Sequence, residues 1–272
     1  AVLALTFTNK AAAVMRERVD HLLGHHGDRA QLCTFHAFAT DVLRQHGSHV
    51  GIQPDFSLLT QEEDRVALLQ EVMEELADED HVLPTDHRNT LVLLDRLFAS
   101  SYDGGPEAPP LGQTPAWIPT FFATYCQRLI ADNRLDFGGL LHFARKLLTE
   151  QPGVTRVLRA GWSYVCVDEF QDTNKAQYDL LRLMVPQDTP NLFVVADDDQ
   201  IIYQWNGASP ERLLALRNDY GMDVVQLPEN YRCPREILDL ANRLIKHNRL
   251  RTEDKQPLTT SRGAETHDGV IF

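Results

Sequence analysis

Apolar runs that stop abruptly at polar residues recur along this chain and predict the strands of a buried sheet. Residues 2–8 are β-branched and apolar, and residues 164–167 and 192–196 are continuously apolar rather than alternating. Continuous apolar character is expected of strands covered on both faces, as in a parallel sheet flanked by helices. Residues 9–23 then show helical spacing before Gly24, so the chain is predicted to open with a strand, a turn and a helix in an α/β fold. The apolar face of this helix is expected to carry Met15, Val19 and Leu22.

The strand pattern disappears between residues 54 and 149, where two apolar stripes at helical spacing replace it. A stretch rich in Gly and Pro at residues 100–115 separates the stripes and predicts a long surface loop. We expect this region to be a helical insertion between strands of the sheet, with its aromatic positions in the core. The two stripes consist of Val66, Leu69, Met73 and Leu76, and of Trp117, Phe121, Tyr125 and Leu129.

The C-terminal part of the chain returns to an α/β pattern. Residues 224–227 and 269–272 have the composition of strands, and a helix is predicted to begin at Pro234 between them. The order of strand, helix and strand predicts the opening of a second α/β domain. The apolar face of the helix is expected to carry Ile237, Leu238, Ala241, Leu244 and Ile245.

Length, charge and cysteine content limit the classes of protein that fit this pattern. With 272 residues, 43% of them hydrophobic, the chain can bury one large core or two modest ones. No run reaches the roughly 18 apolar residues that span a bilayer, and no signal-like leader opens the chain, so a cytoplasmic location without membrane contact is expected. The four cysteines form no CxxC pair, which argues against a zinc site or a disulfide framework.

The formal net charge of −13 argues against a protein that coats nucleic acid non-specifically, because phosphate binding needs a basic surface. Any contact with nucleic acid must then be local. Much of the negative charge falls in residues 61–86, where a solvated helix face is favoured over a partner-binding patch.

Carboxylates follow two of the predicted strands at the point where each strand ends. Asp168 and Glu169 come directly after residues 164–167, and the three aspartates at 197–199 follow residues 192–196. In open α/β sheets a ligand lies beyond the carboxyl ends of the strands, so these side chains are expected to converge. In nucleotide hydrolases one carboxylate there holds Mg²⁺ and a neighbouring one activates the attacking water. An Asp-Glu pair after an apolar run is common, so the dipeptide by itself leaves a structural role open.

Longer strings around these carboxylates carry a more specific signal. The string DEFQDTN at residues 168–174 closely resembles the second helicase motif of the UvrD/Rep family of superfamily 1 DNA helicases. Other strings resemble further motifs of that family in the family's order: LTFTNKAA at 5–12, TFHAF at 34–38, DDDQIIYQW at 197–205 and ENYR at 229–232. The resemblance covers almost the whole chain, although the helical insertion matches only loosely.

The resemblance implies a RecA-like α/β fold, in which a parallel sheet is flanked by helices and carries an all-helical inserted subdomain. Residues 1–53 and 151–223 are expected to form the first motor domain, and residues 54–150 the insertion. Residues 224–272 are expected to begin a second RecA-like motor domain. In the intact family member, ATP would bind between the two motor domains.

For the nucleotide, the resemblance implies ATP and Mg²⁺ as cofactors and assigns roles residue by residue. Asp168 would be the magnesium carboxylate and Glu169 the general base. Gln200 would sense the γ-phosphate, and Arg232 would neutralise charge on the transferred phosphoryl group from the second domain. The remaining implied nucleotide contacts are Gln171, Asp197 and an adenine-stacking Tyr231. Without the family, the Tyr-Arg pair would be an ordinary helix entry.

For DNA, the resemblance implies single strands and junctions between single and double strands as partners. Trp205 would stack on a base, a contact that ignores sequence because every base has a π-face. Trp205 follows a polar cluster and is a poor core candidate, whereas Phe7 lies at a strand end and could equally be packed. The polar candidates would hydrogen-bond phosphates, which surface polar residues can do in any turn. The predicted set is Thr6, Phe7, Thr8, Asn9, Lys10, Thr34, His36, Tyr203 and Trp205.

One part of the family pattern does not occur in this sequence. The Gly-rich phosphate-binding loop, GxxxxGKT or GxxxxGKS, is expected upstream of residues 2–8, and no such string is present. We therefore expect a fragment of a longer helicase that binds nucleotide weakly and is inactive by itself, because the loop supplies the main phosphate cradle.

Three functions fit these observations. The leading prediction is an ATP-dependent DNA helicase or translocase that couples ATP hydrolysis to movement on single-stranded DNA and to duplex unwinding in replication or repair. The second is a non-catalytic DNA-binding relative without the phosphate-binding loop, which a loop upstream of Ala1 would exclude. The third is the motor part of a helicase-nuclease subunit, which a nuclease domain after Phe272 would reveal.

Overall fold

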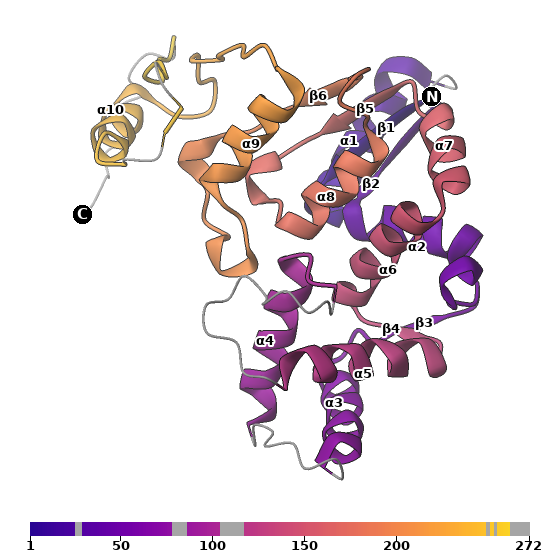
Figure 1. Cartoon of the computed structure of the whole chain (residues 1–272). Helices are drawn as coiled ribbons and strands as arrows, with labels where there is room; N and C mark the ends of the chain where they lie inside the picture. The colour runs from indigo at the N-terminus through magenta and orange to yellow at the C-terminus, as the bar shows by residue number, and fades with distance from the viewer. Residues whose placement is uncertain (25–28, 78–85, 104–116, 249–250, 253–254, 262–272) are drawn as a thin grey trace.

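A parallel four-stranded sheet forms the centre of the protein in a computed structural model (Figure 1). The structure describes residues 1–24, 29–77, 86–103, 117–248, 251–252 and 255–261. In spatial order the strands are β2 (Ala30–Thr34), β1 (Val2–Thr6), β5 (Tyr164–Val167) and β6 (Leu192–Val194). Every neighbouring pair is parallel, so the carboxyl ends of all four strands meet at one edge. The predicted parallel sheet is confirmed.

Helices follow the strands directly, because a threonine at the end of each of the first two strands caps the next helix. The Thr8 Oγ1 accepts a hydrogen bond from the Ala11 N–H at 3.1 Å, and the Thr34 Oγ1 accepts one from the Ala37 N–H at 3.2 Å. None of the described helices has both the length and the apolar character needed to cross a bilayer. The helices around the sheet are α1 (Asn9–Leu23), α2 (Phe35–His46), α6 (Phe137–Glu150), α7 (Pro152–Gly161), α8 (Lys175–Met184) and α9 (Pro210–Tyr220).

The insertion forms the lower lobe in Figure 1 and is built from α3 (Glu62–Ala77), α4 (His87–Ala99) and α5 (Ile118–Ala131). The predicted stripe on α5 is confirmed, since Phe121, Tyr125 and Leu129 are completely buried. The insertion is not purely helical, however. β3 (Ser57–Leu58) and β4 (Arg134–Leu135) form a short parallel pair, because the chain entering the insertion runs beside the chain leaving it.

Helix α6 connects the insertion to the sheet domain. It packs most extensively on α2 and α8, and less on α4 of the insertion. Its position in Figure 1 is likewise between the lower lobe and the sheet. The division at residue 150 stays a prediction, and this packing would favour a boundary between β4 and α6 instead.

The helix at residues 9–23 and the strand at residues 224–227 also differ from the sequence prediction. The predicted apolar face of α1 is not buried: Leu22 is 78% exposed, Met15 and Val19 are only half-buried, and none of the described residues of α1 is fully buried. Residues 224–227 do not form a strand, and Val225 and Leu227 are each 82% exposed. A strand needs a neighbour, and in the described part of this region only a single bridge forms, between Glu229 and Thr259.

The last described helix begins where the sequence predicted. α10 (Arg235–Ile245) follows Pro234 and lies apart from the sheet in Figure 1. Of its predicted apolar face Leu238 is buried, whereas Leu244 is 75% exposed. The strand predicted at residues 269–272 lies outside the described residues.

Candidate functional site

The tips of β5 and β6 are joined by a chain of side-chain hydrogen bonds. The Gln171 Nε2 donates to the Glu169 Oε2 at 2.6 Å, and its Oε1 accepts from the Asp197 N–H at 3.0 Å. The Gln200 Nε2 in turn donates to the Asp197 Oδ2 at 2.6 Å. These predicted residues therefore form one continuous network across two neighbouring strands. Gln171, predicted to contact the nucleotide, is 3% exposed and acts as the bridge of this network.

Glu169 adopts a backbone conformation that non-glycine residues rarely take. Its φ is +50°, in the left-handed region, at the point where β5 turns into the short helix η3 (Phe170–Asp172). The turn is held by the Asp168 N–H, which donates to the Leu5 carbonyl at 2.9 Å, and by the Phe170 N–H, which donates to the Val195 carbonyl at 3.1 Å. Such strain persists where the surroundings fix it, and it is concentrated at functional sites.

The carboxylates of Asp168 and Asp172 lie close enough to Glu169 to feel its negative charge. Burial, with a smaller contribution from Glu169, raises the pKa of Asp168 above its usual value. Burial and Glu169 also raise the pKa of Asp172 to about 6. One carboxylate oxygen of Asp172, Oδ1, is buried without a partner among the described residues. Carboxylate oxygens are hard donors that suit a divalent cation such as Mg²⁺, although among the described residues only the three aspartates at 197–199 bring three such oxygens within 4.8 Å of one another.

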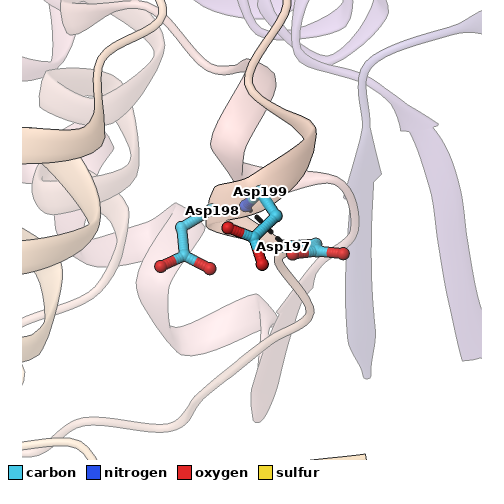
Figure 2. Close-up of side chains that lie close together, drawn as sticks. All are labelled: Asp197, Asp198 and Asp199. Atoms are coloured by element: carbon cyan, nitrogen blue, oxygen red, sulfur yellow. Dashed lines mark hydrogen bonds between the residues drawn. The ribbon is translucent and has the colours of Figure 1, made fainter. Parts of the chain in front are cut away.

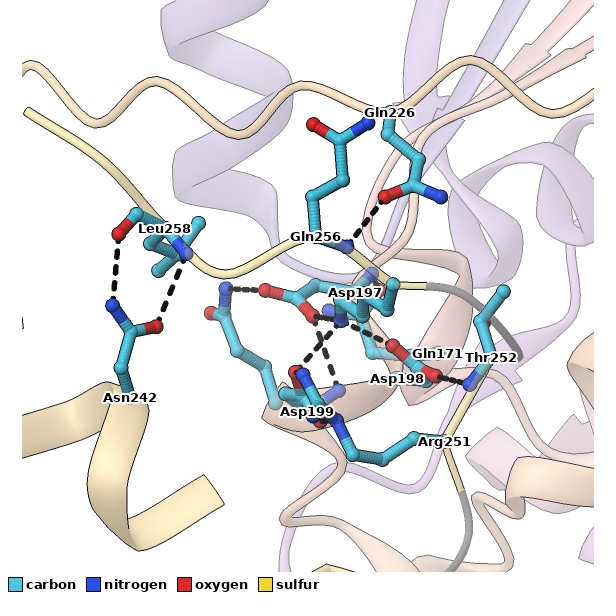
Figure 3. Close-up of polar contacts among 12 residues, drawn as sticks. Gln171, Asp197, Asp198, Asp199, Gln226, Asn242, Arg251, Thr252, Gln256 and Leu258 are labelled. Atoms are coloured by element: carbon cyan, nitrogen blue, oxygen red, sulfur yellow. Dashed lines mark hydrogen bonds and ion pairs between the residues drawn. The ribbon is translucent and has the colours of Figure 1, made fainter. Parts of the chain in front are cut away.

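The acidic turn, defined as Asp197, Asp198 and Asp199, has a different environment. Each residue offers a carboxylate oxygen within 4.8 Å of the others, and Figure 2 shows the three side chains spreading from one turn. The Lys255 ammonium contacts all three, at 2.5 Å from Asp197 and 2.9 Å from Asp199. Arg251 forms a two-point pair with Asp199, both bonds at 2.8 Å (Figure 3). Two protein cations therefore neutralise part of the negative charge of the three aspartates in the acidic turn.

The pKa values of the acidic turn follow from these contacts. Burial would raise the pKa of Asp197 and Asp198, but the hydrogen bonds from Lys255 and its positive charge outweigh burial and lower both. Burial would lower the pKa of Lys255, and its bonds to the aspartates outweigh that effect and raise it. Asp197, predicted as a nucleotide contact, is thus paired with Lys255 and Gln200 in this structure.

Replacing Lys255 with methionine is expected to loosen the contact between the acidic turn and the segment around Thr252. The three carboxylates lose their shared ammonium in a partly buried setting, which should cost about 1–2 kcal/mol. The folded pKa values of Asp197 and Asp198 are depressed, so this contribution is present above the unfolded value of about 3.9 and is lost as pH falls through the lower folded values. The protection factor of the Thr252 amide, which donates to Asp198, measures the loss.

Lys246→Met is the matched control, because Lys246 is exposed at the end of α10 and makes none of the contacts described for Lys255. It should leave the Thr252 amide protected. Equal protection in wild-type protein and Lys255→Met at neutral pH would contradict the assigned contact.

Three aromatic residues predicted to bind DNA form a row close to the hydrogen-bonded network that ends at Gln200. The ring of Phe7 lies 5.1 Å from the ring of Tyr203, which lies 6.0 Å from the ring of Trp205. Trp205, on the short helix η5 (Gln204–Asn206), is 74% exposed. The structure therefore brings the end of β1 next to the loop after β6, and leaves one aromatic face open.

The polar DNA candidates lie at the start of two neighbouring helices. Thr8, Asn9 and Lys10 are exposed at the N-terminus of α1, and the β1–β2 register sets Thr34 at the start of α2 beside them. Helix N-termini attract phosphate because their free N–H groups carry partial positive charge. Thr34 is buried as the cap of α2. Thr6 is completely buried at the end of β1, a placement that does not fit the predicted phosphate contact.

His36 lies at the start of α2 against Phe137, a residue outside the predicted set. Burial lowers the pKa of His36 to about 4, so it is neutral at physiological pH and can offer a hydrogen bond but no charge. The His36 ring meets the Phe137 ring edge-on, with centroids 5.5 Å apart. Phe137 is 50% exposed. The only signal for Phe137 in the sequence is an apolar residue directly after Asp136, the cap of α6, and that signal does not distinguish exposed from buried positions.

Tyr231 and Arg232 lie on the loop before α10. Tyr231 is 70% exposed and its hydroxyl donates to Glu229 at 2.7 Å. Arg232 is exposed as well, and its backbone N–H donates to Asn230. Among the described residues, no hydrogen bond joins the Tyr231 side chain to the network of Glu169 and Gln200, so its role as an adenine contact stays a prediction.

Comparisons with known proteins agree with the motifs. The family model described as the UvrD/REP helicase N-terminal domain matches residues 1–221. The ATP-dependent DNA helicase PcrA of Staphylococcus epidermidis is 32% identical over 248 residues, which cover 91% of this chain and 34% of that protein. PcrA of Staphylococcus aureus is 33% identical over the same shares. The chain thus spans about a third of the length of the curated relatives it matches.

Proposed function

This chain belongs to the UvrD/REP helicase family, and from that premise we propose that it forms the first motor domain of an ATP-driven DNA helicase. The protein would couple ATP hydrolysis to movement on single-stranded DNA and to strand separation in replication or repair. Its substrates would be single strands and junctions of single and double strands, in the cytoplasm. The proposal draws on relatives named as ATP-dependent DNA helicases.

The hydrogen-bonded network from Glu169 to Gln200 is the observation that carries the proposal. Glu169 is linked through Gln171 to Asp197 and then to Gln200. The loop that starts at Gln200 reaches Trp205 within a few residues. A movement of Glu169 on nucleotide binding would therefore be transmitted through these hydrogen bonds to the loop that carries the exposed Trp205.

The chain's own residues fit the catalytic side of an ATP site. Mg²⁺ held at Asp168 would neutralise phosphate oxygens when bound. Glu169 would accept the proton of the attacking water, and Gln171 would hold the Glu169 carboxylate in place through the 2.6 Å bond. Gln200 would turn from Asp197 toward the γ-phosphate. This chain does not contain the string that cradles the β- and γ-phosphates.

DNA would run over the aromatic row and the two helix N-termini. Trp205 is exposed and available for stacking, the Tyr203 ring meets it edge-on, and the Phe7 ring contacts Tyr203. Asn9 and Lys10 at the start of α1 would bind backbone phosphates, which positions a strand without reading its sequence. A local site of this kind is compatible with a chain whose net charge is −13.

Trp205→Ala in the full-length protein tests the proposal. Loss of one stacked base should weaken binding of a fluorescein-labelled oligo(dT) by about tenfold, because stacking contributes roughly 1–3 kcal/mol per base. Fluorescence anisotropy gives the affinity, and phosphate release with and without oligo(dT) gives the ATP turnover. Ile202→Ala is the matched control, since Ile202 is 72% exposed on the same loop but has no aromatic face.

The outcomes separate the candidate functions. An ATP turnover that oligo(dT) stimulates, with a loss in Trp205→Ala and not in Ile202→Ala, supports the motor. Oligo(dT) binding without any ATP turnover would instead favour a non-catalytic DNA-binding relative. Unchanged oligo(dT) affinity in Trp205→Ala would remove Trp205 from the DNA path.

A further inference from the structure

Arg212 forms hydrogen bonds to two segments. In the proposed function one segment serves the nucleotide and the other contacts DNA. Its side chain comes from α9, and the Nη1 atom donates to the Thr173 carbonyl and to the Gly207 carbonyl, each at 2.7 Å. Thr173 lies in the string DEFQDTN that begins with the strand-tip carboxylates. Gly207 directly follows η5, which carries Trp205. One guanidinium nitrogen thus connects both segments.

The loop that Arg212 holds is tightly placed on the start of α8. Gly207 has φ +86° and ends η5, and a β-carbon at this position would lie 3.3 Å from the Cβ of Asn174 and 3.5 Å from the Cβ of Ala99. Asn174 is itself fixed as the N-cap of α8 by a reciprocal capping box with Gln177. The loop therefore has a rigid support, and Arg212 bonds to both the support and the loop.

We propose that Arg212 is a positioning residue that couples the nucleotide-binding turn to the DNA-contacting loop. Its Nη1 atom holds the Gly207 and Thr173 carbonyls close to each other. A displacement of residues 170–173, which follow Glu169, would therefore move Gly207 and with it the loop that presents Trp205. This inference rests on the proposed function. Arg212 touches neither of the predicted ligands, and its removal should leave the Glu169 and Gln171 hydrogen bond intact.

The chemistry of the contact explains why an arginine suits this position. Two carbonyl oxygens converge on one nitrogen, and a charged donor forms shorter and stronger bonds to them than a neutral one. An arginine also keeps its charge when half-buried. A lysine carries the charge and can donate to both oxygens, but its shorter chain reaches them less well, so Arg212→Lys should retain part of the function.

Amide hydrogen exchange on the full-length protein, without DNA or ATP, tests the structural step. In Arg212→Ala, the Gly207 and Ala208 amides, which donate to Gln204 and Tyr203, should exchange about tenfold faster. The amides of α8 should keep their wild-type protection. Arg217→Ala is the matched control, because it removes the same charge from an exposed position on the same helix.

Kinetics of the full-length protein test the coupling step. We expect Arg212→Ala to keep its KM for ATP and its turnover without DNA within about twofold of wild type, and to need about tenfold more oligo(dT) for half-maximal stimulation. Arg212→Lys should fall between Arg212→Ala and wild type. Arg217→Ala should behave as wild type. A general loss of structure would lower turnover with and without DNA alike, and would not produce this split.

The two hypotheses fail in different ways. Wild-type protein whose ATP turnover ignores oligo(dT) would overturn the proposed function, and the inference with it. Normal stimulation in wild type and an equal response in Arg212→Ala would overturn the inference alone. If Arg212→Ala does not fold, Arg212→Lys becomes the test variant. The inference would then be overturned if Arg212→Lys needs the same oligo(dT) concentration as wild type for half-maximal stimulation and its Gly207 amide exchanges at the wild-type rate.

Discussion

Replacing Glu169 with glutamine is expected to lower ATP turnover of the full-length protein by about two to four orders of magnitude while nucleotide affinity is kept. Glutamine has the same shape but cannot take a proton, which removes the contribution of a general base. The Gln171 Nε2 can still donate to the new amide oxygen, so the hydrogen-bonded network should persist. Phosphate release measures turnover, and the fluorescence of a labelled ATP analogue measures binding.

Glu150→Gln serves as the control for this variant, because it removes one carboxylate from an exposed position at the end of α6. It should hydrolyse ATP at the wild-type rate. Turnover of Glu169→Gln close to wild type would remove Glu169 from the catalytic role. A parallel loss of nucleotide affinity would mean that Glu169 serves to bind rather than to activate water.

The part of the site that follows from strand order could be predicted from the sequence. Continuous apolar runs before Asp168 and Asp197 indicate buried parallel strands, and parallel strands place their carboxyl ends at one edge. The structure places β5 beside β6, and Gln171 connects the two tips. The strand predicted at residues 164–167 matches β5 at both ends. The expectation that both strands are covered on both faces is wrong, because Tyr164 of β5 is 64% exposed and Phe193 of β6 is 63% exposed. The apolar runs still located the strands, although they did not predict which of their residues are buried.

Contacts between distant segments could not be predicted in this way. Lys255 and Arg251 pair with the aspartates of the acidic turn across more than fifty residues, and nothing in the local pattern pairs these charges. The Arg212 hydrogen bonds are made to backbone carbonyls, which every residue has. Residues 224–227 failed for a related reason, since β-propensity indicates a strand only where a neighbour completes the hydrogen bonds.

Asp136→Ala is expected to produce the largest loss of stability in the insertion, about 3–5 kcal/mol. The Asp136 carboxylate is completely buried and accepts from the Tyr125 hydroxyl at 2.9 Å, the Arg65 Nε at 3.3 Å and the Gly139 N–H at 2.7 Å. Burial raises the pKa of Asp136, and the charge of Arg65 with the hydrogen bonds from Gly139 and Tyr125 offsets only part of that effect. Removing the carboxylate leaves the Arg65 Nε and the buried Tyr125 hydroxyl without their acceptor, and also removes the N-cap of α6.

The same arginine supplies the matched control, because its other end pairs with Asp95 at 2.5 Å, where the Asp95 side chain is 52% exposed. Asp95→Ala breaks an exposed pair and should cost less than about 1 kcal/mol, since water replaces the lost partner. Urea unfolding followed by circular dichroism compares the two variants under the same conditions. Equal losses would mean that the Asp136 network stabilises the insertion no more than a surface ion pair. A large loss for Asp136→Ala alone would identify this carboxylate as the group that holds α3, α5 and α6 together, and so fixes the helix that leads from the insertion back to the sheet.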